Sequence, residues 1–342
     1  MTFHHKHASR QSRTRHGSRG LATGLLLVLG WCALSTEVGA LQVLELLEPY
    51  SFVVDTDSKA YFISSVNGDE TARDNNGFIT KMDEAGTVVQ LKFIAGGQNG
   101  HTLHAPKGLA IVGRTLYVVD LDQLKGYDKT TGQLLVTVPL GSGAAPQAGP
   151  PSQLMDVVTD GHGLLFVSDR TRDTIYRIAI AKNHQVSILI HNPGLAGPAG
   201  IALHPRGDRL VVVSWDKGKI VEVGFDGALT ELVSNGFFSS RFGNLSGVDF
   251  DQWGNMYVSD FTRGKIWRMQ PDQKFQVIAE YLPSPADIAI DRSNHVILVP
   301  YHYGNAAEVN GLESPIKKGG TKRTLSDYGF APPPSGKDSG AK

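Results

Sequence analysis

The sequence predicts an all-β protein with the fold of a six-bladed β-propeller, and an internal repeat is the first observation behind this prediction. Each of six units opens on a small or short polar residue before an apolar triplet, and a turn then leads to a second apolar run. The six opening residues are Ser51, Gly108, Asp156, Gly200, Gly247 and Asp287. They lie 40 to 57 residues apart, a spacing that is typical of propeller blades made of short strands.

The second observation is the pattern that continues within each unit. Third strands are predicted at 174–178, 219–223 and 265–269, where apolar and polar residues alternate as they do in a half-exposed strand. Fourth strands are predicted at 88–93, 134–138, 186–190, 229–233 and 275–279. Asp-Gly and Gly-Asn pairs separate many of these strands and supply the positive φ that tight hairpins need. No long helical periodicity follows residue 40.

Closure of the ring is predicted from what the sixth unit lacks. It has no fourth strand before the sequence turns polar near Gly311, whereas residues 41–47 form an apolar run outside the first unit. Pairing of this N-terminal strand with the last blade would complete that blade and remove an exposed sheet edge. An open solenoid built from the same repeats is the alternative.

Residues 1–40 have the features of a secretory signal peptide. The first 20 residues hold five basic and no acidic side chains, an apolar run follows, and Val38-Gly39-Ala40 provides small residues for cleavage. The apolar run of roughly 15 residues is shorter than the ~20 that span a bilayer, which favours cleavage over a membrane anchor. We therefore expect a periplasmic or secreted protein with no transmembrane span after cleavage.

The remaining chain divides into a propeller at 41–310 and a tail at 311–342. The tail is rich in Gly, Pro, Ser and Lys and is predicted to be flexible, with a tether to a partner or to the cell envelope as the alternative. The leader and the tail are basic, so residues 41–310 hold 22 basic against 29 acidic side chains. This acidic balance argues against nucleic-acid binding, and the loss of Cys32 with the leader excludes thiol chemistry.

Two units carry a family resemblance. Residues 106–120 (Pro-Lys-Gly-Leu-Ala-Ile and Leu-Tyr-Val-Val-Asp) and 245–260 (Leu-Ser-Gly-Val-Asp-Phe and Met-Tyr-Val-Ser-Asp) resemble NHL repeats. More widely, residues 41–310 are similar to six-bladed propellers of the gluconolactonase and regucalcin type. The resemblance implies this fold and, in the enzymes of that family, a divalent metal held in the central funnel by Glu, Asn and Asp side chains. The matching positions here are Tyr50, Lys107, Met155, Ala199, Ser246 and Ala286.

These six positions do not provide the ligands of the family's metal. None is a carboxylate or an amide, the oxygen donors that Ca²⁺ requires, and Lys107 would repel a cation. We therefore expect no cofactor, with Ca²⁺ as the ion that the resemblance leaves open. Tyr50 and Lys107 are instead candidate ligand-binding residues.

Two carboxylates are candidate catalytic residues. Asp156 and Asp287 stand where the other four units have Gly or Ser, and units three and six face each other across a ring of six. A carboxylate at the mouth of the channel could bind a cation or a substrate hydroxyl, or could act as a base. The alternative is that each side chain caps amides of neighbouring inner strands.

Further candidates lie on loops at the funnel rim. His302 is the third candidate catalytic residue, with a structural role as the alternative. The two aromatic residues that flank it, Tyr301 and Tyr303, are candidates for stacking against a ligand. The arginines of the matching loops are candidates for binding an anionic ligand or for pairing with nearby aspartates: Arg170, Arg172 and Arg263. The long polar insertion 64–77 is a candidate lid or partner-contact loop.

The function predicted from these features is binding. Repeated blades with varied rim loops form a recognition platform, so we expect an exported monomer that binds a small-molecule, protein or envelope ligand at its funnel. The alternative is a gluconolactonase-like hydrolase of lactones or esters, with or without a divalent metal, that uses Asp156, Asp287 and His302. The sequence leaves open whether the protein is an enzyme.

Overall fold

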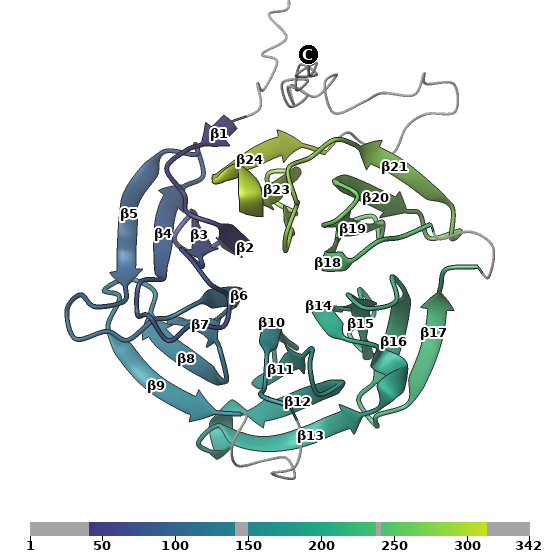
Figure 1. The fold of residues 1–342 in the computed structure, drawn as a ribbon, viewed down its shortest axis with the longest axis horizontal. Helices are drawn as coiled ribbons and strands as arrows, with labels where there is room; N and C mark the ends of the chain where they lie inside the picture. The colour runs from purple at the N-terminus through teal and green to yellow at the C-terminus, as the bar shows by residue number, and fades with distance from the viewer. Residues whose placement is uncertain (1–40, 141–149, 237–240, 313–342) are drawn as a thin grey trace, which may run out of the picture. The chain divides into compact units, whose positions relative to one another are not determined.

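The computed structural model describes residues 41–140, 150–236 and 241–312, and these form the six-bladed propeller that the repeat predicts. Each blade is a four-stranded antiparallel sheet, and the sheets are arranged around a central axis (Figure 1). Three short 3-10 helices, η1 (Ile180–Lys182), η2 (Pro193–Leu195) and η3 (His302–Gly304), complete the regular structure of the described residues. The leader 1–40 and most of the tail 311–342 lie outside these residues.

The strands of the first three blades follow one another along the chain, from the axis outward. Blade 1 consists of β2 (Pro49–Asp55), β3 (Ala60–Ser65), β4 (Phe78–Asp83) and β5 (Val88–Ala95). Blade 2 consists of β6 (Pro106–Val112), β7 (Thr115–Asp120), β8 (Gln123–Asp128) and β9 (Leu134–Pro139). Blade 3 consists of β10 (Leu154–Thr159), β11 (Leu164–Asp169), β12 (Thr174–Ala179) and β13 (Gln185–His191).

The last three blades repeat this order, except that the final blade takes a strand from the other end of the propeller. Blade 4 consists of β14 (Pro198–Leu203), β15 (Arg209–Ser214), β16 (Ile220–Gly224) and β17 (Leu229–Val233). Blade 5 consists of β18 (Leu245–Phe250), β19 (Met256–Asp260), β20 (Lys265–Met269) and β21 (Phe275–Ala279). Blade 6 consists of β22 (Ala289–Asp291), β23 (Val296–Tyr301), β24 (Ala306–Gly311) and β1 (Leu41–Val43).

Closure by the N-terminal strand is confirmed, although the strand is shorter than predicted. β1 pairs antiparallel with β24, which places it on the outer edge of blade 6. It ends at Val43 because Glu45 has a φ of 66°, in the left-handed region, and this turns the chain toward β2. The inner strand of blade 6 is also short, since Pro285 makes only an isolated bridge to Tyr301 before β22 begins at Ala289.

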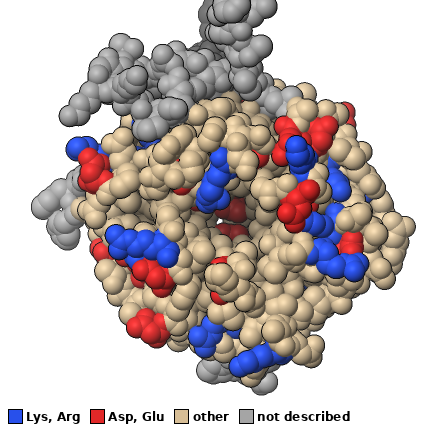
Figure 2. All heavy atoms as spheres, turned by 180° about the vertical axis from the view of Figure 1, so that it is seen from behind, with Lys and Arg blue, Asp and Glu red and all other residues tan. Residues whose placement is uncertain are grey.

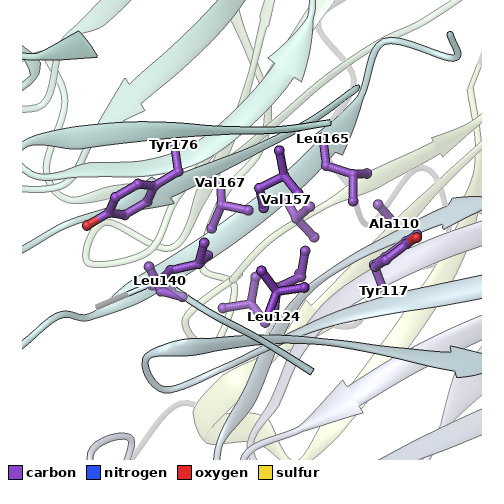
Figure 3. Close-up of a cluster of buried hydrophobic side chains, with 12 residues drawn as sticks. Ala110, Tyr117, Leu124, Leu140, Val157, Leu165, Val167 and Tyr176 are labelled. Atoms are coloured by element: carbon purple, nitrogen blue, oxygen red, sulfur yellow. The ribbon is translucent and has the colours of Figure 1, made fainter. Parts of the chain in front are cut away.

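The apolar core lies between neighbouring blades. Figure 3 shows the cluster between blades 2 and 3, where Tyr117 and Leu124 pack against Val157, Val167 and other side chains of the next sheet. Burial of each large apolar side chain stabilises the fold by about 1.5–3 kcal/mol. Equivalent clusters occur around the ring, so every blade is held by both of its neighbours.

The inner strands share a β-bulge at the position of the repeated small residue. The register with the second strand shifts between Pro106 and Leu109 in blade 2, and the corresponding shift occurs in blades 1, 3, 4 and 5. At this bulge the neighbouring inner strand comes so close that a Cβ on Gly108 would lie 2.4 Å from Cα of Asp156. The repeat therefore opens on small residues because the inner strands converge there.

A serine in every second blade fixes these bulges, a role that was not predicted from the sequence. Ser168 Oγ accepts a hydrogen bond from the Asp156 amide (3.1 Å) and donates one to the Ala199 carbonyl of the next blade (2.6 Å). Ser64 and Ser259 make the equivalent pairs of bonds from blades 1 and 5. The signal was present, because all three serines stand at matching positions near the end of the second strand.

No helix within the described ranges is long and apolar enough to cross a membrane.

Candidate functional site

A cavity of about 460 Å³ lies at the centre of the propeller, and it contains the two aspartates that the sequence singles out. Its walls come from the second halves of the inner strands, including apolar residues from all six blades: Phe52, Leu109, Val157, Ile201, Val248 and Ile288. Figure 2 shows a central hollow with acidic side chains at its floor and a basic side chain at its edge. The charged residues that line the cavity are Asp156, Asp249, Asp287 and Arg292.

Asp156 comes from the bulge of β10 and is buried. Its Oδ1 accepts a hydrogen bond from its neighbour's amide, that of Val157 (2.7 Å), and its Oδ2 accepts one from the Ile201 amide of blade 4 (2.8 Å). The side chain therefore links blades 3 and 4, which is the amide-capping role that the sequence left open. Burial raises the pKa of Asp156 to about 7, and the two amide bonds offset part of that rise.

Asp287 lies just before β22 and faces the same cavity from blade 6. The Ser51 hydroxyl of blade 1 donates a hydrogen bond to its Oδ2 (2.6 Å), and its amide donates to the Tyr50 carbonyl (2.8 Å). Burial raises the pKa of Asp287 well above its ordinary value, and the negative charge of Asp156 raises it further. The two carboxyl groups therefore share one cavity, and the raised pKa of each favours its protonated form relative to an exposed aspartate.

Asp249 is a third acidic residue of the cavity that the sequence analysis did not identify. Its Oδ2 accepts the Ile290 amide (2.8 Å), and its Oδ1 is 2.6 Å from the guanidinium of Arg292, so its charge is paired. The signal was available in the repeat, because Asp249 stands where the other five units have small or apolar residues: Val53, Ala110, Val158, Ala202 and Ala289.

The predicted rim residues lie outside the lining of this cavity, at the end of the channel where the inner strands begin. Buried apolar side chains pack together there, among them Tyr50, Met155, Phe261 and Ala286. We call this end of the propeller the rim end. Asp156 and Asp287 thus share a cavity with each other, and His302 does not line it.

His302 is buried at the start of η3. Its Nε2 is 3.6 Å from Oε1 of Glu70, which belongs to the insertion 64–77, and its ring contacts the rings of Tyr50, Phe261 and Tyr303. Burial lowers the pKa of His302, which favours the neutral ring. The flanking Tyr303 is 68% exposed at the rim end.

Tyr301 and the rim arginines are engaged in separate contacts. The Tyr301 hydroxyl donates to Glu308 Oε2 of β24 (2.9 Å), within blade 6. Arg170 lies 3.5 Å from Asp216 and stacks over Trp215, which realises the pairing with an aspartate that the sequence left open. Arg172 donates to the Pro150 carbonyl (3.1 Å), and the Arg263 amide donates to Asp260 Oδ1 (3.1 Å).

The residues at the family's metal positions do not fit a divalent cation. All six are buried, and the ammonium group of Lys107 lies among them, 5.9 Å from the centre of the Tyr50 ring. Tyr, Lys, Met, Ala, Ser and Ala side chains cannot supply the six to eight oxygen ligands that Ca²⁺ takes. Within the described part of the chain, no group of three His, Cys, Asp or Glu side chains could hold a metal ion.

Comparison with known proteins places the fold but not the family. Neither the protein-family models nor the curated proteins provide a match. Among solved structures, virginiamycin B lyase from Staphylococcus aureus matches with a TM-score of 0.55 and 12% identity over 79% of this chain and 98% of the lyase. A calcium-binding regucalcin from Agrobacterium tumefaciens matches with a TM-score of 0.57 and 17% identity over 79% of this chain and 91% of the regucalcin. A candidate 6-phosphogluconolactonase from Bacteroides uniformis matches with a TM-score of 0.54 and 16% identity over 76% of this chain and 80% of that protein.

These likenesses define the class of protein to which the chain can be compared. It has the fold of six-bladed propellers of the regucalcin and lactonase type, as the sequence resemblance predicts. At identities below 20% the likeness concerns the fold alone, because one propeller fold carries many unrelated activities.

Proposed function

We propose that the protein is an exported binding module that takes a small, uncharged, hydroxyl-rich molecule in its central cavity. The observation that carries this proposal is the placement of Asp156 and Asp287, from opposite blades, in one cavity of about 460 Å³. Cavities of about 300–1,000 Å³ with apolar walls and a few convergent polar groups are typical of small-molecule sites. The regular repeat and the common fold support a recognition role.

The charge balance of the cavity favours a neutral ligand. Asp249 is paired with Arg292, and burial raises the pKa of Asp287 and so disfavours its charged form. A protonated Asp287 donates a hydrogen bond, and Asp156 accepts one. Hydroxyl groups both donate and accept, so a polyol or a sugar complements this pair better than a simple cation or anion does.

The proposal is tested by isothermal titration calorimetry of the purified protein with a panel of pentoses, hexoses and linear polyols. We expect binding by at least one of them, and we expect Asp287→Leu to weaken that binding at least about tenfold because a hydrogen-bond partner is lost. Asp226→Leu, at an exposed turn between β16 and β17, is the matched control and should bind as the wild type does. If no member binds, or if both variants behave alike, the central cavity is not the site.

A hydrolase of lactones or esters is the second candidate, and the pKa of Asp156 favours it. A carboxylate with a pKa of about 7 lies in the range that suits a general base near neutral pH, where it could take a proton from a water that attacks a carbonyl carbon. Turnover of δ-lactones and aryl esters that is lost in Asp156→Asn would establish this activity. Unchanged turnover in that variant would exclude Asp156 as the base.

Export and the nature of the partner remain parts of the proposal. Residues 1–40 carry the signal-peptide pattern, and we propose a periplasmic or secreted monomer that begins near residue 41. Cell fractionation with N-terminal sequencing of the mature protein tests this, and recovery of the full-length chain from the cytosol would contradict it. A protein or envelope ligand at the rim loops would be recognised by co-purification that depends on those loops rather than on the cavity.

A further inference from the structure

Three side chains meet at the rim end that are far apart in the sequence and belong to different blades. Lys107 is the second residue of β6 in blade 2, His302 opens η3 in blade 6, and Glu70 lies in the insertion 64–77 of blade 1. Oε2 of Glu70 is 3.4 Å from Nζ of Lys107, and Oε1 is 3.6 Å from Nε2 of His302. One carboxylate therefore bridges two nitrogen groups, one through each of its oxygens.

The two nitrogen groups are fixed in the protein interior, whereas the carboxylate comes from the surface. The side chains of Lys107 and His302 are 1% and 3% exposed, and that of Glu70 is 30% exposed. A buried ammonium group is strongly destabilising unless an anion pairs with it. Among the described residues, Glu70 is the acid within 4.0 Å of Lys107, so this surface glutamate supplies the anion that the interior requires.

The bridge leaves hydrogen-bonding capacity unused. Its distances of 3.4 and 3.6 Å exceed the 2.7–2.9 Å of a charge-assisted hydrogen bond, and Nζ of Lys107 also donates to the Glu70 backbone carbonyl at 3.4 Å. Nδ1 of the buried His302 ring has no hydrogen-bond partner among the described residues. An unpaired buried atom of this kind is rare in protein interiors, and the His302 ring that carries it contacts the ring of Tyr50.

A groove lies beside this cluster, and Glu70 is the member of the cluster that lines it. The groove has a volume of about 580 Å³ and is lined by Glu70, Thr71, Leu121, Gln153 and other residues of the insertion and the rim loops. Glu70 takes part in both features, since it lines the groove and contacts Lys107, which the groove does not reach. A molecule in the groove that carries its own carboxylate would meet Lys107 and His302 as soon as the Glu70 side chain moved aside.

We propose that Lys107 and His302 form a binding site for the carboxylate group of a small organic acid, and that the Glu70 carboxylate occupies this site when no ligand is bound. The rest of the ligand lies in the groove beside the insertion 64–77. This site is separate from the central cavity and does not depend on what the cavity binds. The class of ligand follows from the bridge itself, because a planar group with two oxygens already spans the two nitrogens.

The test is competition between Glu70 and an added carboxylate. Acetate, lactate and benzoate are titrated into the purified protein and into Glu70→Gln, with binding followed by calorimetry and by the NMR signals of the His302 ring. A tethered side chain competes at an effective concentration of millimolar or more, so we expect Glu70→Gln to bind at least one of these acids at least about tenfold more tightly. Acetamide, which is neutral and of similar shape, should not bind to either protein.

Two further variants make the result specific. Glu70→Gln combined with Lys107→Met removes both charges, leaves no unpaired buried charge and should abolish the gained affinity. Glu231→Gln is the control. Glu231 lies on β17, and its Oε2 is 3.6 Å from Nζ of Lys219, so this change breaks a similar lysine–glutamate pair and should leave the affinity at the wild-type level. Thermal unfolding of each variant shows that it is folded.

Three results would overturn the proposal. Equal affinities in Glu70→Gln and the wild type would show that Glu70 does not occupy a ligand site. Retained affinity in the double variant would place the site elsewhere. Inorganic phosphate or chloride binding to Glu70→Gln as tightly as the carboxylates would show that the cluster responds to negative charge alone.

Discussion

Replacement of Asp156 by asparagine should change how the stability of the protein depends on pH. In the unfolded chain an aspartate titrates near pH 3.8, whereas in the folded protein burial raises the pKa of Asp156 to about 7. Between these values the folded state binds more protons than the unfolded state, so wild-type stability falls as pH rises through this window. Below pH 3.8 the carboxyl is protonated in both states, and above pH 7 the full penalty is present.

The size of the effect follows from the shift. Each pKa unit corresponds to 1.36 kcal/mol, so a rise from 3.8 to about 7 corresponds to at most about 4 kcal/mol of stability lost between pH 4 and pH 8. The asparagine side chain of the variant cannot titrate, and because the Val157 and Ile201 amides bond to different oxygens of Asp156, the variant keeps an acceptor for only one of them. The lost bond lowers stability by about 1–3 kcal/mol at every pH and does not alter the slope.

The assay is urea unfolding at pH 4.5, 6 and 8, followed by tryptophan fluorescence. We expect the unfolding free energy of the wild type to fall relative to that of Asp156→Asn by about 2–4 kcal/mol across this range. Asp226→Asn, at an exposed turn, is the control and should run parallel to the wild type. If the curves of Asp156→Asn and the wild type are also parallel, the Asp156 carboxyl does not titrate in this window and the burial argument fails.

Three further predictions concern the fold. Gly108→Ala should lower the unfolding free energy by at least about 2 kcal/mol, because the added Cβ would lie 2.4 Å from the backbone of the next blade. Gly311→Ala is the control for the same urea assay and should have little effect, since no atom lies within 4 Å of a Cβ built there. Ser168→Ala should lower the unfolding free energy by about 2 kcal/mol through two lost hydrogen bonds, measured against Ser234→Ala at an exposed position after β17. A chain that begins at residue 48 lacks β1, which leaves β24 as an exposed sheet edge. It should have a lower melting temperature and should aggregate, as measured by light scattering. An unchanged melting temperature would contradict the role of β1 in closure.

The fold could be predicted from the sequence because one pattern recurs six times. A single short apolar run such as 245–250 is ambiguous, but its repetition with turns at similar spacing fits a propeller and little else. The error at the N-terminus has a local cause. Residues 44–47 read as a continuation of the strand, but the left-handed conformation of Glu45 ends the pairing at Val43. A propensity pattern does not specify that turn.

The candidate sites were predictable only in part. Asp156 and Asp287 stood out because they break the repeat, and Asp249 breaks it at another position in the same way. Glu70 could not be found by this comparison, since the insertion 64–77 has no counterpart in the other blades. Its contact with His302 joins residues more than 200 positions apart and depends on the conformation of an irregular loop. Deviations from a repeat can be located by comparing its copies, whereas contacts made by inserted loops cannot.

The bulge in β2 explains how one short strand contributes to both ends of the channel. Tyr50 and Ser51 are adjacent, yet the Tyr50 ring lies beside Lys107 and His302 at the rim end, while the Ser51 hydroxyl donates to Asp287 in the cavity. A regular strand would place their side chains on opposite faces of the sheet. The register of β2 with β3 shifts between Pro49 and Phe52, so the bulge interrupts this alternation where the blades converge. Small residues at the bulge thus allow the inner strands to converge, and in the two blades where an aspartate replaces them its carboxyl group lines the central cavity.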